Sequence, residues 1–129
     1  NRPANEFVAT FLGAPRINLV DRPGARAPLP HQALWQALTG SAPASVQRAG
    51  LRPEHLRVTE AGEGIAASVV LAEHLGDSSI LHLRVDGVEA LLNAKIGADH
   101  RPVATGQAVG LVPGPSWALA FDAAGRLVS

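Results

Sequence analysis

The sequence predicts a mainly β domain: a small barrel or sandwich with a short N-terminal helix and a second short helix inserted before the strands. The chain has 129 residues, enough for one domain around one core. From about residue 46 onward, short apolar stretches of strand character alternate with turns containing glycine, proline or aspartate. This alternation is typical of small β-barrels and sandwiches. The two helical patterns are brief and precede it.

The first predicted element is an amphipathic helix over residues 5–12. Phe7 and Phe11 recur at helical spacing, Asn5 can cap the first turn, and Gly13 ends the pattern. We therefore expect one short helix with a single apolar face.

A brief strand and a second short helix follow. Residues 17–20, INLV, are a strand candidate, and the loop after them contains three prolines, which prevent a long regular element. Leu34, Trp35 and Leu38 share one side of the next helical pattern, which ends at Gly40.

The strongest strand signals lie between Ile65 and Ile96. Asp86 and Gly87 form the dipeptide of a two-residue hairpin turn. The turn predicts a register with three core-facing pairs and one outer charged pair: Val85 with Val88, Leu83 with Ala90, Leu81 with Leu92, and Arg84 with Glu89. A longer strand precedes this hairpin and reaches it through the polar turn GDSS. Three more short strands are expected in QAVGLVP, WALAF and RLV.

Composition excludes several function classes. Eleven basic and eleven acidic residues give a net charge of zero, and aromatic residues make up only 4% of the chain, so a nucleic-acid surface is not expected. The absence of cysteine removes disulfides and thiolate chemistry. The sequence contains no phosphate-binding loop, nucleophile elbow or zinc-protease motif. No apolar run reaches the roughly 18 residues of a membrane span.

The stretch GLRPEHL is the most chemically suggestive part of the chain. Arg52, Glu54 and His55 could supply an anion contact and acid/base groups. Pro53 instead fixes a corner in the backbone, since it restricts both itself and the residue before it. We favour the corner, with its charges at a domain or subunit boundary.

A second acid/base candidate is the neighbouring pair Glu73 and His74. Neighbouring residues of a strand point to opposite faces, so the two side chains are not expected to act on one substrate.

Four stretches in order resemble the C-terminal part of the ATP-binding subunits of carbohydrate-importing ABC transporters, the maltose and glycerol-3-phosphate uptake group. They are RPANEFVATFLGAPRINLV, GLRPEHL, VVLAEHLGDSSILHLRVDG and FDAAGRL, and together they span nearly the whole chain. The positions that match the family motifs are Pro3, Asn5, Phe7, Val8, Ala9, Phe11, Gly13, Pro15, Asn18, Gly50, Leu51, Arg52, Pro53, Glu54, His55, Glu73, Leu75 and Gly76. Each motif alone is weak, but four in order are specific.

The resemblance implies two segments. Residues 1–15 would be the last helix of a nucleotide-binding domain, and residues 16–129 a regulatory β-barrel of the OB-like, transport-associated (TOBE) type, which does not bind oligonucleotides in this family. The family's phosphate loop, signature sequence and magnesium-binding acid lie upstream of the matching part, so we expect this chain to begin after them. ATP and magnesium would then belong to that upstream domain, and this chain would hold no cofactor and be no enzyme.

The implied partners are the subunit's own nucleotide-binding domain, a homodimer partner, the importer's membrane subunits and, in some relatives, regulatory proteins. The implied location is cytoplasmic, at the inner face of the cell membrane. Interface candidates are the motif residues Arg52, Pro53, Glu54, His55, Glu73 and Gly76. The alternative is a barrel that senses a small ligand, an oxyanion or a sugar, because related molybdate-binding domains hold an oxyanion in a similar barrel.

Overall fold

The structure is a computed structural model that describes residues 17–40, 42–114 and 118–128. It consists mainly of strands, as predicted, with one α-helix and one short 3-10 helix. The strands are β1 (Asn18–Asp21), β2 (Arg48–Leu51), β3 (Leu56–Glu60), β4 (Ile65–His74), β5 (Ser78–Arg84), β6 (Leu92–Gly97), β7 (Ala108–Pro113), β8 (Leu119–Phe121) and β9 (Leu127–Val128). The α-helix is α2 (Leu29–Thr39), and the 3-10 helix is η1 (Pro53–His55). The helix predicted over residues 5–12 lies outside the described residues.

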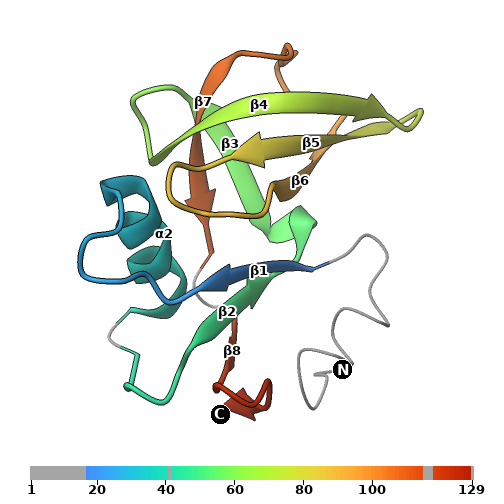
Figure 1. Ribbon diagram of the computed structural model, residues 1–129. Coiled ribbons are helices and arrows are strands. Elements are labelled where there is room, and N and C mark those ends of the chain that lie inside the picture. Colours follow the sequence, from blue (N-terminus) through green and yellow to red (C-terminus); the bar gives the residue numbers. More distant parts are fainter. Residues whose placement is uncertain (1–16, 41, 115–117, 129) are drawn as a thin grey trace.

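The strands form two antiparallel sheets. Four strands pair in the order β1-β2-β8-β9, and five pair in the order β3-β7-β4-β5-β6. Figure 1 shows the five-stranded sheet above the four-stranded sheet, with α2 beside both. The outer strands β3 and β6 of the five-stranded sheet also pack against each other, so this sheet is curled into a half-barrel. The predicted OB-like β-barrel class is confirmed.

The inserted helix α2 is confirmed where the sequence placed it. Leu34, Trp35 and Leu38 are buried, as their spacing predicted, and they join the main core. Pro30 lies in the first turn, where a missing backbone N–H costs no helical hydrogen bond. The core thus forms between α2 and the facing sides of both sheets, with Val20 of β1 and Leu111 of β7 among its members.

The predicted two-residue hairpin is wrong in its register. A turn does form at Asp86 and Gly87, where the Val88 N–H donates to the carbonyl oxygen of Val85. Strand pairing resumes only at Leu92, which lies opposite Leu83 instead of Leu81. The shift of two residues keeps Leu81, Leu83 and Leu92 on the core face, because side chains alternate with a period of two. Ala90, predicted on that face opposite Leu83, is exposed and precedes β6, so its predicted place is also wrong.

Tertiary packing explains this shift. Val85 and Val88 are both buried, and a Cβ on Gly87 would lie 2.7 Å from Pro28, just before α2. The turn is therefore packed against the start of the helix and cannot continue directly into a paired strand. The pairing of β5 with β6 ends at Leu83 and Leu92, so the predicted pairing of Arg84 with Glu89 is also wrong.

A buried asparagine joins the two sheets where their edges meet. Asn18 of β1 is 5% exposed, and its Nδ2 donates to the carbonyl oxygen of Asn93 in β6 over 2.8 Å. Its Oδ1 accepts the Asn93 backbone N–H over 2.6 Å. Because β6 is the outermost strand of its sheet, these two bonds replace part of the strand pairing that an edge lacks.

Candidate functional site

The stretch GLRPEHL forms the corner between the two sheets. Leu51 ends β2 in the four-stranded sheet, and Leu56 begins β3 in the five-stranded sheet. Both leucines are buried, and Pro53 between them is fully buried in η1. The His55 N–H donates to the carbonyl oxygen of Arg52, which closes the single turn. The structural interpretation of this stretch as a proline-fixed corner is confirmed.

The charged side chains of this corner differ in exposure. Arg52 and Glu54 are exposed, and His55 is half-buried where η1 packs near β6. Their role at a domain or subunit boundary stays a prediction.

Glu73 and Gly76 lie in a different part of the fold, at the end of the β4–β5 hairpin. Glu73 Oε1 is 2.5 Å from His82 Nε2 of β5, whereas His74 Nδ1 is 2.9 Å from Ser79 Oγ. The neighbouring Glu73 and His74 thus have separate partners, as their alternation along the strand predicted. Gly76 occupies the exposed turn with φ of +81°.

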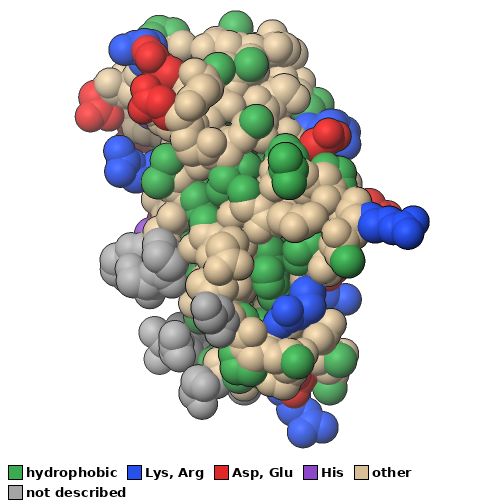
Figure 2. Space-filling model, turned by 90° about the vertical axis from the view of Figure 1, so that its left-hand side faces the viewer, with side chains coloured by type: hydrophobic (Ala, Val, Ile, Leu, Met, Phe, Trp, Pro, Cys, Tyr) green, Lys and Arg blue, Asp and Glu red, His purple; other side chains and the backbone are tan. Residues whose placement is uncertain are grey.

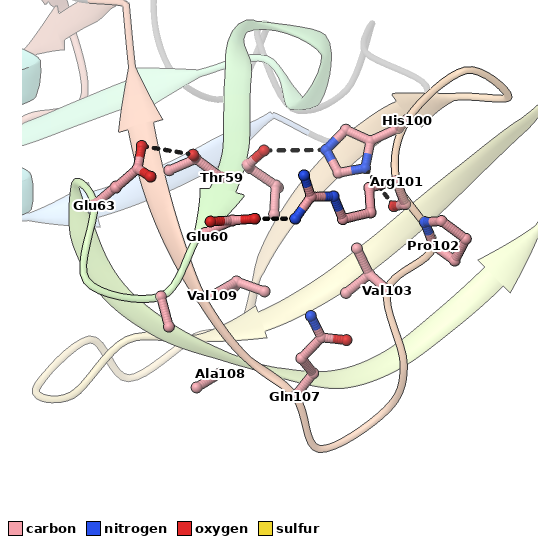
Figure 3. Close-up of a pocket in the computed structure, with 12 residues that line it drawn as sticks. Thr59, Glu60, Glu63, His100, Arg101, Pro102, Val103, Gln107, Ala108 and Val109 are labelled. Atoms are coloured by element: carbon pink, nitrogen blue, oxygen red, sulfur yellow. Dashed lines mark hydrogen bonds and ion pairs between the residues drawn. The ribbon is translucent and has the colours of Figure 1, made fainter.

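A pocket lined by several polar groups was not anticipated from the sequence. It lies between β3, the start of β7 and the loop 98–107, and has a volume of about 620 Å³ (Figure 3). We call it the β3–β7 pocket. Its residues are Val58, Thr59, Glu60, Ala61, Glu63, His100, Arg101, Pro102, Val103, Gln107, Ala108 and Val109.

Two side chains tie the loop to β3. Arg101 pairs with Glu60 across the pocket rim, as Figure 3 shows. His100 Nε2 lies 3.0 Å from the carbonyl oxygen of Val58, and its Nδ1 lies 2.7 Å from that of Arg101. Since both acceptors are carbonyl oxygens, an imidazolium ring donates to both and a neutral ring to only one.

The opposite side of the pocket is the turn between β3 and β4, together with the start of β7. The hydroxyl of Thr59 donates to Glu63 Oε1 over 3.3 Å. Gln107 Oε1 accepts the backbone N–H of Ala104 over 2.9 Å, which fixes the side-chain amide at the pocket. The backbone of Glu63 itself is held tightly, because a Cβ on Gly110 would lie only 1.6 Å from its carbonyl oxygen.

Sequence reasoning missed this site because its groups come from distant stretches. Forty-one residues separate Glu60 from Arg101, and nothing in their local spacing indicates a shared site. The only local signal is the triplet His100-Arg101-Pro102, a charged cluster beside a proline in a long connection.

The face that carries α2 has a different character. Figure 2 shows hydrophobic side chains across the middle of this face and charged side chains toward its edges. Leu29, the first residue of α2, is 79% exposed.

The grouping of possible metal ligands and the length of the helices also bear on function. Within residues 17–40, 42–114 and 118–128, no group of three or more His, Cys, Asp or Glu side chains is arranged to hold a metal ion. Over the same ranges, none of the helices is both long and apolar enough to cross a membrane.

Comparison with known proteins places this fold in a family context. Residues 49–121 match the family model described as the TOBE domain. The chain is 36% identical over 130 residues to the sn-glycerol-3-phosphate import ATP-binding protein of Paracoccus denitrificans, covering 94% of this chain and 34% of that protein. An uncharacterized ABC transporter ATP-binding protein of Sinorhizobium fredii is 35% identical, with 95% and 33% covered.

A third relative agrees with these two. The sn-glycerol-3-phosphate import ATP-binding protein of Chromohalobacter salexigens is 33% identical, with 98% of this chain and 36% of that protein covered. This chain therefore spans about a third of the length of the curated relatives it matches. The resemblance to import ATP-binding subunits is confirmed.

Proposed function

The chain belongs to the TOBE domain family, and from this premise we propose that it is the regulatory domain of the ATP-binding subunit of an ABC importer for sugars or related solutes. The observation that carries the proposal is the similarity to two import ATP-binding proteins along 94% and 98% of the chain, although the chain spans only about a third of each. The glycerol-3-phosphate named for these two relatives belongs to the class of solutes proposed.

In this proposal, the activity belongs to the parent subunit. Residues 1–15 end the nucleotide-binding domain, which binds ATP and magnesium, and residues 16–129 form the regulatory domain. The parent subunit lies at the cytoplasmic face of the membrane against the importer's membrane subunits, and the regulatory domain packs on its copy in a second subunit and receives regulatory proteins. By itself, the regulatory domain catalyses no reaction.

The corner between the sheets is suited to such contacts. Pro53 is fully buried and Leu51 and Leu56 anchor both sides, so the backbone beneath Arg52 and Glu54 is rigid. A rigid backbone presents exposed charges to a neighbouring domain or subunit with little loss of conformational entropy on binding. We include His55, Glu73 and Gly76 as further contact candidates.

The proposal is tested on the parent subunit from the same gene. Deleting the region that corresponds to residues 16–129 should leave ATP binding intact and weaken association of the two subunits in the nucleotide-free state, measured by sedimentation. A charge reversal that pairs Arg52→Glu with Glu54→Lys should weaken association less than the deletion does. Asp77→Asn, an equally exposed change outside the corner, serves as the control.

Two results would contradict this assignment. One is ATP turnover by the purified 129-residue chain, since the proposal gives the hydrolytic site to another domain. The other is an unchanged dimer dissociation constant after the deletion.

A second role, the sensing of a small ligand, is favoured by the β3–β7 pocket. Its volume of about 620 Å³ lies within the range of small-molecule sites in proteins. The sequence analysis left an oxyanion or a sugar as the ligand, and the groups that line the pocket distinguish between these two.

A further inference from the structure

The β3–β7 pocket combines an apolar floor with a polar rim. Val58 and Val109 are 9% and 3% exposed, and Val103 of the loop is half-buried beside them. Beside them lie the polar side chains of Glu60, Arg101 and Gln107, whereas Thr59 and the Glu63 carboxylate that it contacts lie toward the opposite face of β3 (Figure 3). A site of this kind offers apolar contact surface to the carbon skeleton of a ligand and hydrogen-bonding groups to the ligand's polar substituents.

The contacts within the rim leave both donors and acceptors for a ligand. A guanidinium carries five N–H donors, and Arg101 is joined to Glu60 through one nitrogen. The amide oxygen of Gln107 is occupied by the Ala104 N–H, which leaves the amide NH₂ as a donor. The Glu60 carboxylate has one oxygen at Arg101 and lone pairs beyond that contact.

The charge of the rim disfavours an anion. The Arg101 guanidinium is already paired with the Glu60 carboxylate, and both ring nitrogens of His100 lie at backbone carbonyl oxygens. A sulfate, phosphate or molybdate ion would meet the Glu60 carboxylate, and the one arginine among the pocket's described residues is already paired with that carboxylate.

A cationic amine fits less well than a hydroxylated molecule. An ammonium group only donates hydrogen bonds, so it cannot use the N–H donors of Arg101 and Gln107. No Trp, Tyr or Phe is among the pocket's described residues to hold a cation over a ring. Hydroxyl groups donate to carboxylates and accept from guanidinium and amide groups, so they match both halves of the rim.

We propose that the β3–β7 pocket binds a neutral polyhydroxylated small molecule, a polyol or a monosaccharide. Its hydroxyls donate to Glu60 and accept from Gln107 and Arg101, while its C–H face contacts Val109. The inference rests on the sensing role proposed above and is independent of the importer assignment, since binding is measured on the 129-residue chain alone.

The test is a titration of the ¹⁵N-labelled chain followed by NMR. Sorbitol and glucose are the hydroxylated probes, inorganic phosphate is the anion, and spermidine is the amine. Thermal shifts alone are unsuitable, because polyols at high concentration stabilise proteins without binding a site. We expect sorbitol or glucose to cause saturable shifts confined to the pocket, including the side-chain NH₂ of Gln107, and phosphate and spermidine to cause none there.

Three variants separate this site from general effects. Glu60→Gln should weaken binding about tenfold, because it replaces a charge-assisted hydrogen bond with a neutral one. Ala61→Trp should abolish binding, because it adds a large side chain to an exposed residue of the pocket. Glu89→Gln is the matched control, the same change at an exposed residue outside the pocket, and should leave the affinity unaltered.

The outcomes are distinct. Saturable binding of phosphate or spermidine in place of the hydroxylated probes overturns the ligand class and keeps the sensing role. Absence of saturable binding by every probe overturns both, but leaves the importer assignment, which rests on subunit association. Equal effects of Glu60→Gln and Glu89→Gln would show that the pocket is not the binding site.

Discussion

Replacing Asn18 with alanine should destabilise the domain strongly, because this one side chain joins the two sheets. In the wild-type chain, both its amide nitrogen and its amide oxygen bond to the backbone of Asn93. Alanine removes both bonds and leaves a backbone N–H and a backbone C=O on the outer strand β6 without these partners. Asn18 is 5% exposed, so water does not simply replace its amide group.

The magnitude follows from these two groups. A buried donor or acceptor that loses its partner costs about 1–3 kcal/mol. Asn93 is half-buried, so water reaches part of its backbone, and we expect a total of about 3 kcal/mol. Such a loss is a large share of the roughly 5–15 kcal/mol that stabilises a domain. Asn18→Asp should cost at least as much, because it keeps the acceptor but places a second acceptor against the Asn93 carbonyl oxygen.

Urea unfolding of the 129-residue chain measures this effect. With an m value of about 1.5 kcal/mol/M, a loss of about 3 kcal/mol lowers the midpoint by about 2 M. Asn93→Ala is the matched control, since Asn18 binds only the backbone of Asn93, and it should change stability by less than about 1 kcal/mol. A loss below about 1 kcal/mol for Asn18→Ala, or an equal loss for both variants, would refute the reasoning.

Three further substitutions test other parts of the structure. Gly110→Ala should unfold or severely destabilise the chain, because the added Cβ would lie 1.6 Å from the Glu63 carbonyl oxygen. Gly24→Ala is its control and should change the urea midpoint little, because a Cβ at Gly24 meets nothing within 4 Å. Phe121→Ala should lower the free energy of unfolding by about 3–5 kcal/mol in the same assay, since Phe121 is fully buried and packs with Ile17 in a small hydrophobic cluster apart from the main core. A loss below about 2 kcal/mol would contradict the importance of this cluster. Arg22→Ala removes two hydrogen bonds, to the carbonyl oxygens of Val46 and Pro43, and the stacking of the guanidinium on Trp35. It should therefore lower the free energy of unfolding by about 1–2 kcal/mol and change the tryptophan fluorescence. An unaltered spectrum would show that this stacking is absent in solution.

Local sequence patterns predicted most of the elements correctly. The apolar spacing of Leu34, Trp35 and Leu38 predicts the buried face of α2, and alternation along the β5 strand predicts which of its residues enter the core. These predictions succeed because helical and strand periods are local properties of the backbone. Pro53 likewise fixes the corner between the sheets, because its ring restricts the backbone whatever surrounds it.

The register of the β5–β6 pair was not predictable from the sequence. The dipeptide Asp86-Gly87 favours an immediate hairpin, but the contact of Gly87 with Pro28 and the burial of Val88 hold the connection against α2. A shift of two residues leaves the apolar face intact, so the hydrophobic pattern alone cannot distinguish the two registers.

The sequence by itself therefore determined the class of fold, the buried faces and the family, since these follow from periodicity, backbone restriction and ordered motifs. The tertiary structure alone decided where separate segments meet. Asn18 reaches Asn93 across 75 positions, and Arg101 reaches Glu60 across 41. The first contact depends on how β1 of one sheet meets β6 of the other, and the second on how the curled sheet brings β3 and β6 together; no local period encodes either approach. The β3–β7 pocket exists only through the second.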